Sequence, residues 1–151
     1  MEKKIKIGFL LNKITTEQFA IIESFYKDNE EVQYNFGLHF GFDKEARIIA
    51  VFFKFNFQQD GNPFLIIEVG GHFLIETETW SSFYNIDTEM ITIPKGFIQH
   101  LSVITVGTSR GILHAKTENT IFNKFILPAV NLTEIIKEDV TFSLKAGKPV
   151  I

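Results

Sequence analysis

The alternation of apolar and polar residues predicts a chain dominated by β-strands. From Val32 to Phe42 every second residue is apolar, and the residues between them are polar or glycine. Strict alternation of this kind is typical of a strand with one buried face. The stretch 48–57 is apolar on both faces for much of its length, which indicates a central strand or one whose second face meets another subunit. A further apolar stretch over 64–75 and the short connections between the three predict an antiparallel meander.

The N-terminal region is harder to interpret. Residues 5–11 are apolar apart from Lys6 and predict a first strand. Thr15-Thr16-Glu17-Gln18 resembles a helical capping box and precedes apolar residues at helix-like spacing, so a helix and a crossover loop both fit there. Gly70-Gly71, inside the third meander strand, predicts a bulge or a bend.

Pro94 predicts the start of a long helix, because a proline in the first turn removes no hydrogen bond that the helix needs. We expect the helix to reach Gly111 or beyond and to end within 117–120. Its predicted apolar stripe is formed by Phe97, Ile98, Leu101, Ile104 and Thr108, and the residues expected to fall outside it are Lys95, Gln99, Ser102 and Thr105.

The remaining segments are less regular in sequence. Residues 76–90 are polar with three aromatic side chains and are predicted to form a long loop. A short C-terminal helix is expected over 131–136, with Asn131 or Thr133 as its cap. We therefore predict one domain over 1–144, followed by a loosely ordered tail at 145–151.

Composition narrows the classes of function. The chain has 151 residues, of which 45% are hydrophobic, and no cysteine, which removes disulfides and thiol catalysis. Fifteen basic against 18 acidic residues give a net charge of −3, which argues against nucleic acid as a partner. Phenylalanine accounts for 17 residues, against 3 tyrosines and 1 tryptophan. The chain therefore needs either a very aromatic core or an exposed apolar surface that has a function.

No segment has the length expected of a membrane helix or an export signal. The N-terminal apolar run is short and interrupted by Lys6, and no stretch approaches the roughly 18 uninterrupted apolar residues that a membrane helix requires. We expect a cytoplasmic protein that does not insert into membranes.

The sequence offers no convincing catalytic or cofactor-binding pattern. No two of the four histidines lie at the spacing of a helical metal site, and neither glycine-rich nucleotide-binding motif occurs. Ser102, Thr108 and Ser109 lack the nucleophile-elbow motif, and the paired acids Glu76/Glu78 and Glu30/Glu31 are typical of solvated charge. We therefore expect neither an enzyme nor a bound cofactor or metal.

Glu68 interrupts an otherwise apolar strand and shares a face with Phe64 and Ile66. Either that face is partly solvated at one end, or it displays Glu68 on a semi-apolar surface for a partner.

Several landmarks together resemble the SecB family of export chaperones. They are Phe64-Leu65-Ile66-Ile67-Glu68-Val69 followed by Gly70-Gly71-His72-Phe73, then Pro94 at a helix start, Ser109-Arg110-Gly111 towards its end, and Leu127-Pro128-Ala129-Val130-Asn131 before a short helical start. Their order and spacing match over roughly residues 45–136.

The resemblance implies an α+β fold: a four-stranded antiparallel sheet with a long helix and a short C-terminal helix packed on one face. It implies a homotetramer assembled as a dimer of dimers. It also implies an ATP-independent chaperone that binds unfolded or exported polypeptides in aromatic grooves of the oligomer and passes them to the SecA motor through a flat acidic sheet surface.

Residue by residue, the resemblance carries over only in part. Glu68 matches the family's motor-contacting glutamate, Ile66 the apolar residue two positions before it, and Glu17 is a looser match to an acidic residue near the first strand. Lys13 stands where the family has an acid, 112–125 is partly an insertion, and the C-terminus lacks the family's long second helix and metal-binding acidic tail.

For client binding, we predict that Trp80, Phe83 and Tyr84, with Phe52 from the two-faced strand, help to line a groove, although core packing is an alternative role for Phe52. The competing hypothesis is a SecB-like interaction module without general chaperone activity, which binds one folded partner. A small-molecule-binding domain would instead need a closed pocket of about 300 Å³ or more lined by convergent polar groups.

Overall fold

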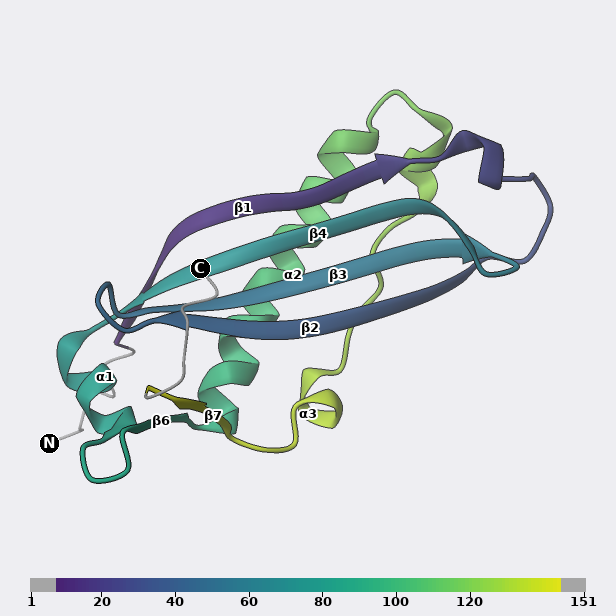
Figure 1. The fold of residues 1–151 in the computed structure, drawn as a ribbon. Helices are drawn as coiled ribbons and strands as arrows, with labels where there is room; N and C mark the ends of the chain where they lie inside the picture. The colour runs from purple at the N-terminus through teal and green to yellow at the C-terminus, as the bar shows by residue number, and fades with distance from the viewer. Residues whose placement is uncertain (1–7, 145–151) are drawn as a thin grey trace, which may run out of the picture.

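Four long antiparallel strands form the main sheet of the protein. The structure is a computed structural model that describes residues 8–144; the predicted tail at 145–151 and the start of the predicted first strand lie outside the described residues. The strands run in the order β1-β4-β3-β2 across the sheet (Figure 1). Their bounds are β1 Phe9–Ile21, β2 Gln33–Asp43, β3 Ile48–Gln59 and β4 Asn62–Ile75.

One long helix and several short elements complete the fold. The helices are α1 Thr77–Phe83, α2 Lys95–Thr117 and α3 Leu132–Ile135, with short 3-10 helices at Glu23–Phe25 and Ile121–Lys124. A second, smaller sheet consists of β5 Tyr84–Asn85, β6 Met90–Ile93 and β7 Val140–Ser143, in the order β5-β6-β7. The expected α+β class, with a four-stranded antiparallel sheet and a long helix, is confirmed.

The predicted meander β2-β3-β4 is present, and β3 is the central strand that its two apolar faces indicated. It pairs with β2 on one side and with β4 on the other. Phe53 and Phe55 point towards α2, whereas Phe52 and Lys54 point to the opposite side of the sheet, because successive side chains of a strand alternate. We call the side away from α2 the open face; it is turned towards the viewer in Figure 1.

The N-terminal stretch that resembled a helix start is part of a long strand. β1 pairs with β4 along its whole length, with irregularities of register between Leu11 and Lys13 and between Thr16 and Gln18. Each irregularity inserts a residue and shifts the alternation of side chains. The apolar spacing of 15–26 therefore imitated a helix, and both earlier interpretations of 15–18 were wrong.

The bulge predicted at Gly70-Gly71 does not occur, because both glycines pair in regular register with β3. The two glycines allow neighbouring elements to approach β4 closely, one on each face of the strand. A Cβ on Gly71 would come within 2.5 Å of the Thr105 hydroxyl of α2, and one on Gly70 within 2.5 Å of the Thr15 hydroxyl of β1. The missing side chains let the helix and the neighbouring strand pack tightly there.

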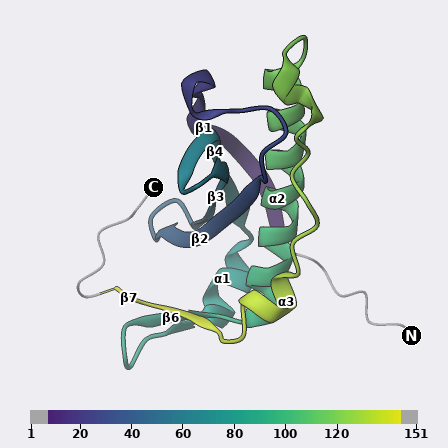
Figure 2. The same cartoon turned by 90° about the vertical axis from the view of Figure 1, so that its right-hand side faces the viewer.

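Helix α2 crosses one face of the sheet and covers β3 and β4 (Figures 1 and 2). Pro94 precedes it and Thr117 ends it, within the predicted limits. The prediction that Ser102 and Thr105 lie outside the buried stripe was wrong: both are buried against the sheet. Their hydroxyls donate to the carbonyl oxygens of Ile98 (2.7 Å) and Leu101 (3.0 Å), which removes the cost of burying them.

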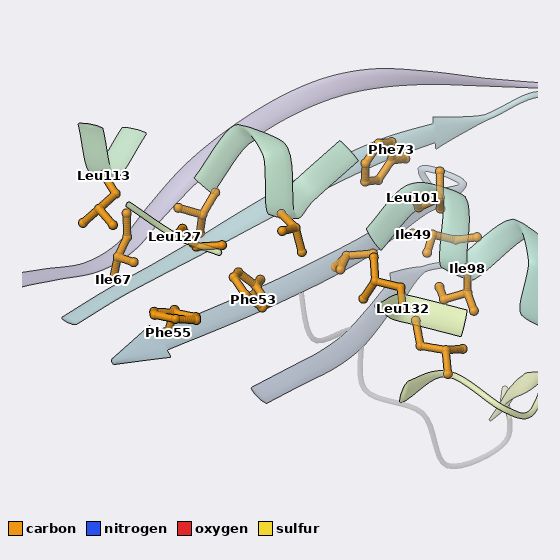
Figure 3. Packing of buried hydrophobic residues seen from close by; sticks show 14 of the residues in the cluster. Ile49, Phe53, Phe55, Ile67, Phe73, Ile98, Leu101, Leu113, Leu127 and Leu132 are labelled. Carbon is orange, nitrogen blue, oxygen red and sulfur yellow. The ribbon is translucent and has the colours of Figure 1, made fainter. Parts of the chain in front are cut away.

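The core lies between the sheet and α2 (Figure 3). Phe53 and Phe55 of β3, Ile67 of β4 and Leu101 of α2 are all fully buried or nearly so. At about 25 cal/mol per Å² of apolar surface, burial of these large side chains is the main source of stability. Many of the phenylalanines thus belong to the core, one of the two uses that the composition left open.

The segment predicted as a loop over 76–90 contains α1 and the start of the second sheet. Most of its polar residues are exposed, while Trp80 and Phe83 pack against the core and hold the segment in a regular conformation. The short C-terminal helix α3 is confirmed, with Asn131 at its N-cap position. Among residues 8–144, none of the helices has the length and hydropathy needed to cross a membrane.

Candidate functional site

The most distinctive surface of the molecule lies along β2, at an edge of the main sheet. Tyr34, Phe36, Leu38 and Phe40 point to the same side as α2 because they pair with the core-facing residues of β3. The helix crosses the sheet obliquely and contacts mainly β3 and β4, so part of the length of β2 lies outside its cover (Figure 1). As a result, Tyr34 is 54% exposed and Phe36 is 37% exposed.

Both exposed rings are held in place by a buried one. Tyr34 stacks on Phe55 with 5.3 Å between ring centroids and 21° between planes. Phe36 stacks on the same ring at 6.3 Å and 3°. Aromatic pairs of this kind contribute about 0.5–1.5 kcal/mol beyond area burial, so the rings form an ordered apolar surface.

A groove of about 460 Å³ runs between β2 and the segment that leads from α3 to β7. Its floor and walls are mainly apolar and its rim is charged. Gly37 borders the groove with its backbone, and its Cβ position faces the open side of the sheet, where nothing lies within 4 Å. The lining residues are Phe36, Gly37, Leu38, Phe40, Ile135, Ile136, Lys137, Glu138, Asp139 and Val140.

Helix α2 anchors the outer wall of this groove. The side-chain amide of Gln99 donates to the carbonyl oxygen of Ile136 (2.7 Å), and the Lys95 backbone N–H donates to the Asp139 carboxylate (2.9 Å). Further along, the Arg110 guanidinium donates to the carbonyl oxygens of Leu127 (2.8 Å) and Pro128 (3.0 Å). Hydrogen bonds donated by α2 thereby fix an irregular segment opposite β2.

The chemistry of the groove suits an extended polypeptide. The outer edge of β2 carries backbone N–H and C=O groups that pair with no strand in the part of the chain that the structure describes. Peptides bind such edges by adding a strand, with backbone hydrogen bonds for affinity and apolar pockets for alternate side chains. Aromatic and aliphatic lining gives contacts that tolerate many sequences.

The four residues predicted to bind clients are not brought together. Phe52 is 5% exposed on the open face, where its ring stacks on His39. Trp80 and Phe83 lie on α1, are partly buried and pack against the core. Tyr84 is 37% exposed and lies in β5, in the small sheet whose last strand begins at the groove residue Val140.

The three residues predicted to bind a partner do share one region of the open face. Glu68 and Ile66 lie on β4, where they pair with Gln18 and Ala20 of β1. Glu17 lies at the second register irregularity of β1, and its carboxylate accepts a hydrogen bond from the Thr15 hydroxyl (2.8 Å). Glu68 is half-buried and Glu17 is exposed.

The three hydroxyl side chains considered as nucleophiles form hydrogen bonds within α2. The hydroxyls of Ser102, Thr108 and Ser109 each donate to the carbonyl four residues earlier in α2. Within residues 8–144, no three histidine or acidic side chains gather as metal ligands would. A second depression of about 600 Å³ lies between the two 3-10 helices; it is open and its lining is mixed, with Glu23 and Asp28 beside apolar residues.

The sequence marked the groove residues only as the buried face of a strand. The alternation from Val32 to Phe42 assigned Tyr34 and Phe36 to the inward side correctly, but the position of β2 at the sheet edge depends on non-local pairing.

The chain matches no protein-family model, no curated protein and no solved structure.

Proposed function

We propose that this chain is an ATP-independent, SecB-like chaperone that binds unfolded polypeptides along β2. The observation that carries the proposal is the exposure of Tyr34 and Phe36 beside an apolar groove at a sheet edge. An unfolded client offers groups that complement this site, namely extended backbone for hydrogen bonds and apolar side chains at alternate positions. The role is a cytoplasmic one.

The small sheet extends this proposed client surface beyond the groove. Val140 both lines the groove and begins β7, and Tyr84 lies across Ile91 from Phe142 in the three-stranded ladder. Of the residues predicted to bind clients, Tyr84 therefore best supports a continuous client surface from the groove along the small sheet. Trp80 and Phe83 pack against the core and Phe52 packs on the open face, so these three residues have packing roles in this account.

Assembly and export are further parts of the proposal. A dimer of dimers would cover exposed apolar side chains such as Leu10 and Ile14 on β1 and Val103 on α2. The SecA motor would dock on the open face around Glu17, Ile66 and Glu68. These residues match the family's motor-contacting positions and lie in one region of that face. Lys13, on the same strand as Glu17, weakens the acidic character of that surface.

A suppression assay tests the proposal. A chemically unfolded model protein is diluted into buffer with increasing amounts of the chain, and aggregation is followed by light scattering. Wild type is compared with the double variant Tyr34→Ser/Phe36→Ser and with the control Gln33→Ser/Asn35→Ser, which changes the open face of the same strand. We expect wild type and control to keep the client soluble and the aromatic variant to lose most of this effect.

The result also separates the two classes of function. A chaperone suppresses aggregation of several unrelated clients, and size-exclusion light scattering gives a tetramer. A folded, monomeric or dimeric chain without effect on any client would overturn the chaperone assignment in favour of an interaction module that binds one folded partner.

A further inference from the structure

His72 is a buried histidine on the open face of the sheet. It is 6% exposed and lies near the C-terminal end of β4. The Phe52 ring meets the imidazole edge-on, with centroids 5.6 Å apart. A Cβ on Gly70 would come within 3.0 Å of the imidazole Nε2, so the ring occupies space that the glycine leaves free.

The hydrogen bonds around Thr15 define how the proton of His72 is placed. The Thr15 hydroxyl donates its single proton to the Glu17 carboxylate (2.8 Å), so towards His72 Nε2 (3.0 Å) it acts as the acceptor. Nε2 therefore carries the hydrogen and Nδ1 a lone pair. Nδ1 is buried and has no hydrogen-bond partner among the residues that the structure describes.

This environment fits a neutral imidazole and penalises a charged one. Protonation would place an N–H at Nδ1 with no acceptor, in a site sheltered from water. Burial lowers the pKa of His72 below its ordinary value of 6.5, the ammonium group of Lys13 lowers it further, and the Glu17 carboxylate acts in the opposite direction. The other titratable groups nearby on this face are Lys54 of β3, Glu68 of β4 and His39 of β2, which stacks on the far side of Phe52.

Residues 13–16 of β1 are held to β4 mainly by backbone pairing and by the contact between Thr15 and His72. Residues 13–16 of β1 lie between the two register irregularities, and β1 is an edge strand of the sheet. Lys13, Ile14 and Thr16 are exposed. Edge segments with few buried contacts open locally at much lower free energy than the core.

We propose that His72 is an acid-sensitive latch: the neutral imidazole fits the closed strand, and a proton on the sheltered Nδ1 favours opening of residues 13–16 of β1, which admits water to the ring while the core beneath α2 stays folded. Release uncovers the backbone edge of β4 over 69–72. The latch is independent of client binding at β2, which lies at the opposite edge of the sheet.

Hydrogen exchange read by NMR on the full chain tests the latch. After correction for intrinsic rates, the amides of 13–16 should open more at about pH 5 than at about pH 8, by roughly tenfold for each unit between the pKa values of the closed and open forms. Core amides of α2 should show no such change. In His72→Gln, which keeps a donor near Thr15 but has no titratable group, the difference should disappear.

Two further measurements keep the test decisive. The variant His39→Gln changes the exposed histidine on the same face and should retain the wild-type response. If His72→Gln does not fold, Thr15→Val is used instead, because it removes the anchoring hydroxyl. It should raise the opening of the amides of residues 13–16 by the same factor at both pH values. Equal pH dependence in wild type and His72→Gln, or a histidine NMR signal showing His72 already charged at about pH 6.5, would overturn the latch.

Discussion

The ring of Phe36 lies parallel to that of Phe55, with centroids 6.3 Å apart and an angle of 3° between the planes. Phe55 is completely buried, whereas Phe36 is 37% exposed, because β2 extends past the helix that covers β3. The exposed ring is thus fixed by a buried one, and little side-chain entropy remains to be lost when a client covers it. This pair is the clearest link between the core and the proposed binding surface.

The two rings should differ in their contribution to stability. Phe55→Ala should lower the free energy of unfolding by about 3–5 kcal/mol, because it leaves a cavity in the core. Phe36→Ala should cost clearly less, because this ring is 37% exposed and leaves no closed cavity; the loss combines its smaller buried area with the stacking contribution of about 0.5–1.5 kcal/mol. Urea unfolding measures both. A loss as large for Phe36→Ala as for Phe55→Ala would mean that the groove ring is structural.

A side chain at Gly71 should be poorly tolerated. Gly71→Ala should destabilise the fold by about 1–3 kcal/mol, because its Cβ meets the Thr105 hydroxyl and the helix must move. Combining it with Thr105→Ala should recover part of the loss, which a double-mutant cycle measures. Additive effects in the cycle would show that the two residues do not touch.

Gly107 supplies the matched control for that experiment. It lies on the exposed side of α2, and a Cβ there would meet nothing within 4 Å. Gly107→Ala should stabilise the protein by up to about 1 kcal/mol through helix propensity alone, as read by thermal or urea unfolding. Destabilisation by this variant would contradict the packing of α2 described above.

The outer wall of the groove should depend on Gln99. Gln99→Leu removes the donor to the Ile136 carbonyl and should cost about 0.5–1.5 kcal/mol of stability. Because the wall is then less fixed opposite β2, client affinity, measured by fluorescence anisotropy of a labelled unfolded peptide, should weaken several-fold. Unchanged affinity would show that the wall takes no part in binding.

Stability should depend on pH through His72. Its folded-state pKa lies below 6.5, so the unfolded chain binds more protons between that pKa and pH 6.5. The free energy of unfolding contributed by this group is therefore complete above pH 6.5 and falls as the pH drops towards the folded-state pKa. Urea unfolding at a series of pH values should show this decline in wild type and a flatter profile in His72→Gln. Identical profiles would contradict it.

Local patterns in the sequence predicted the regular parts of the fold. Strict alternation located β2, two-faced apolarity identified β3 as central, and Pro94 fixed the start of α2. Each of these signals depends on neighbouring residues along the chain. β1 was misjudged because two register irregularities break its alternation, and these arise only from its pairing with β4.

Features that depend on distant segments were missed. Ser102 and Thr105 are buried because Gly71 admits the helix closely and because their hydroxyls bond within α2, neither of which the apolar stripe shows. The groove depends on two non-local facts: β2 is at a sheet edge, and residues 135–140 return to lie opposite it. Tyr34 and Phe36 were assigned to the correct face, but their exposure follows only from the assembled fold.

The most direct test of the account is to locate a bound client on the chain. An unfolded, carboxymethylated model peptide is titrated into the isotope-labelled full-length protein, and backbone amide shifts are followed by NMR. The proposal predicts saturable shifts along β2, from Gln33 to Asp43, and in residues 135–140 opposite it. Binding confined to the open face around Glu68, or no binding at all, would contradict it.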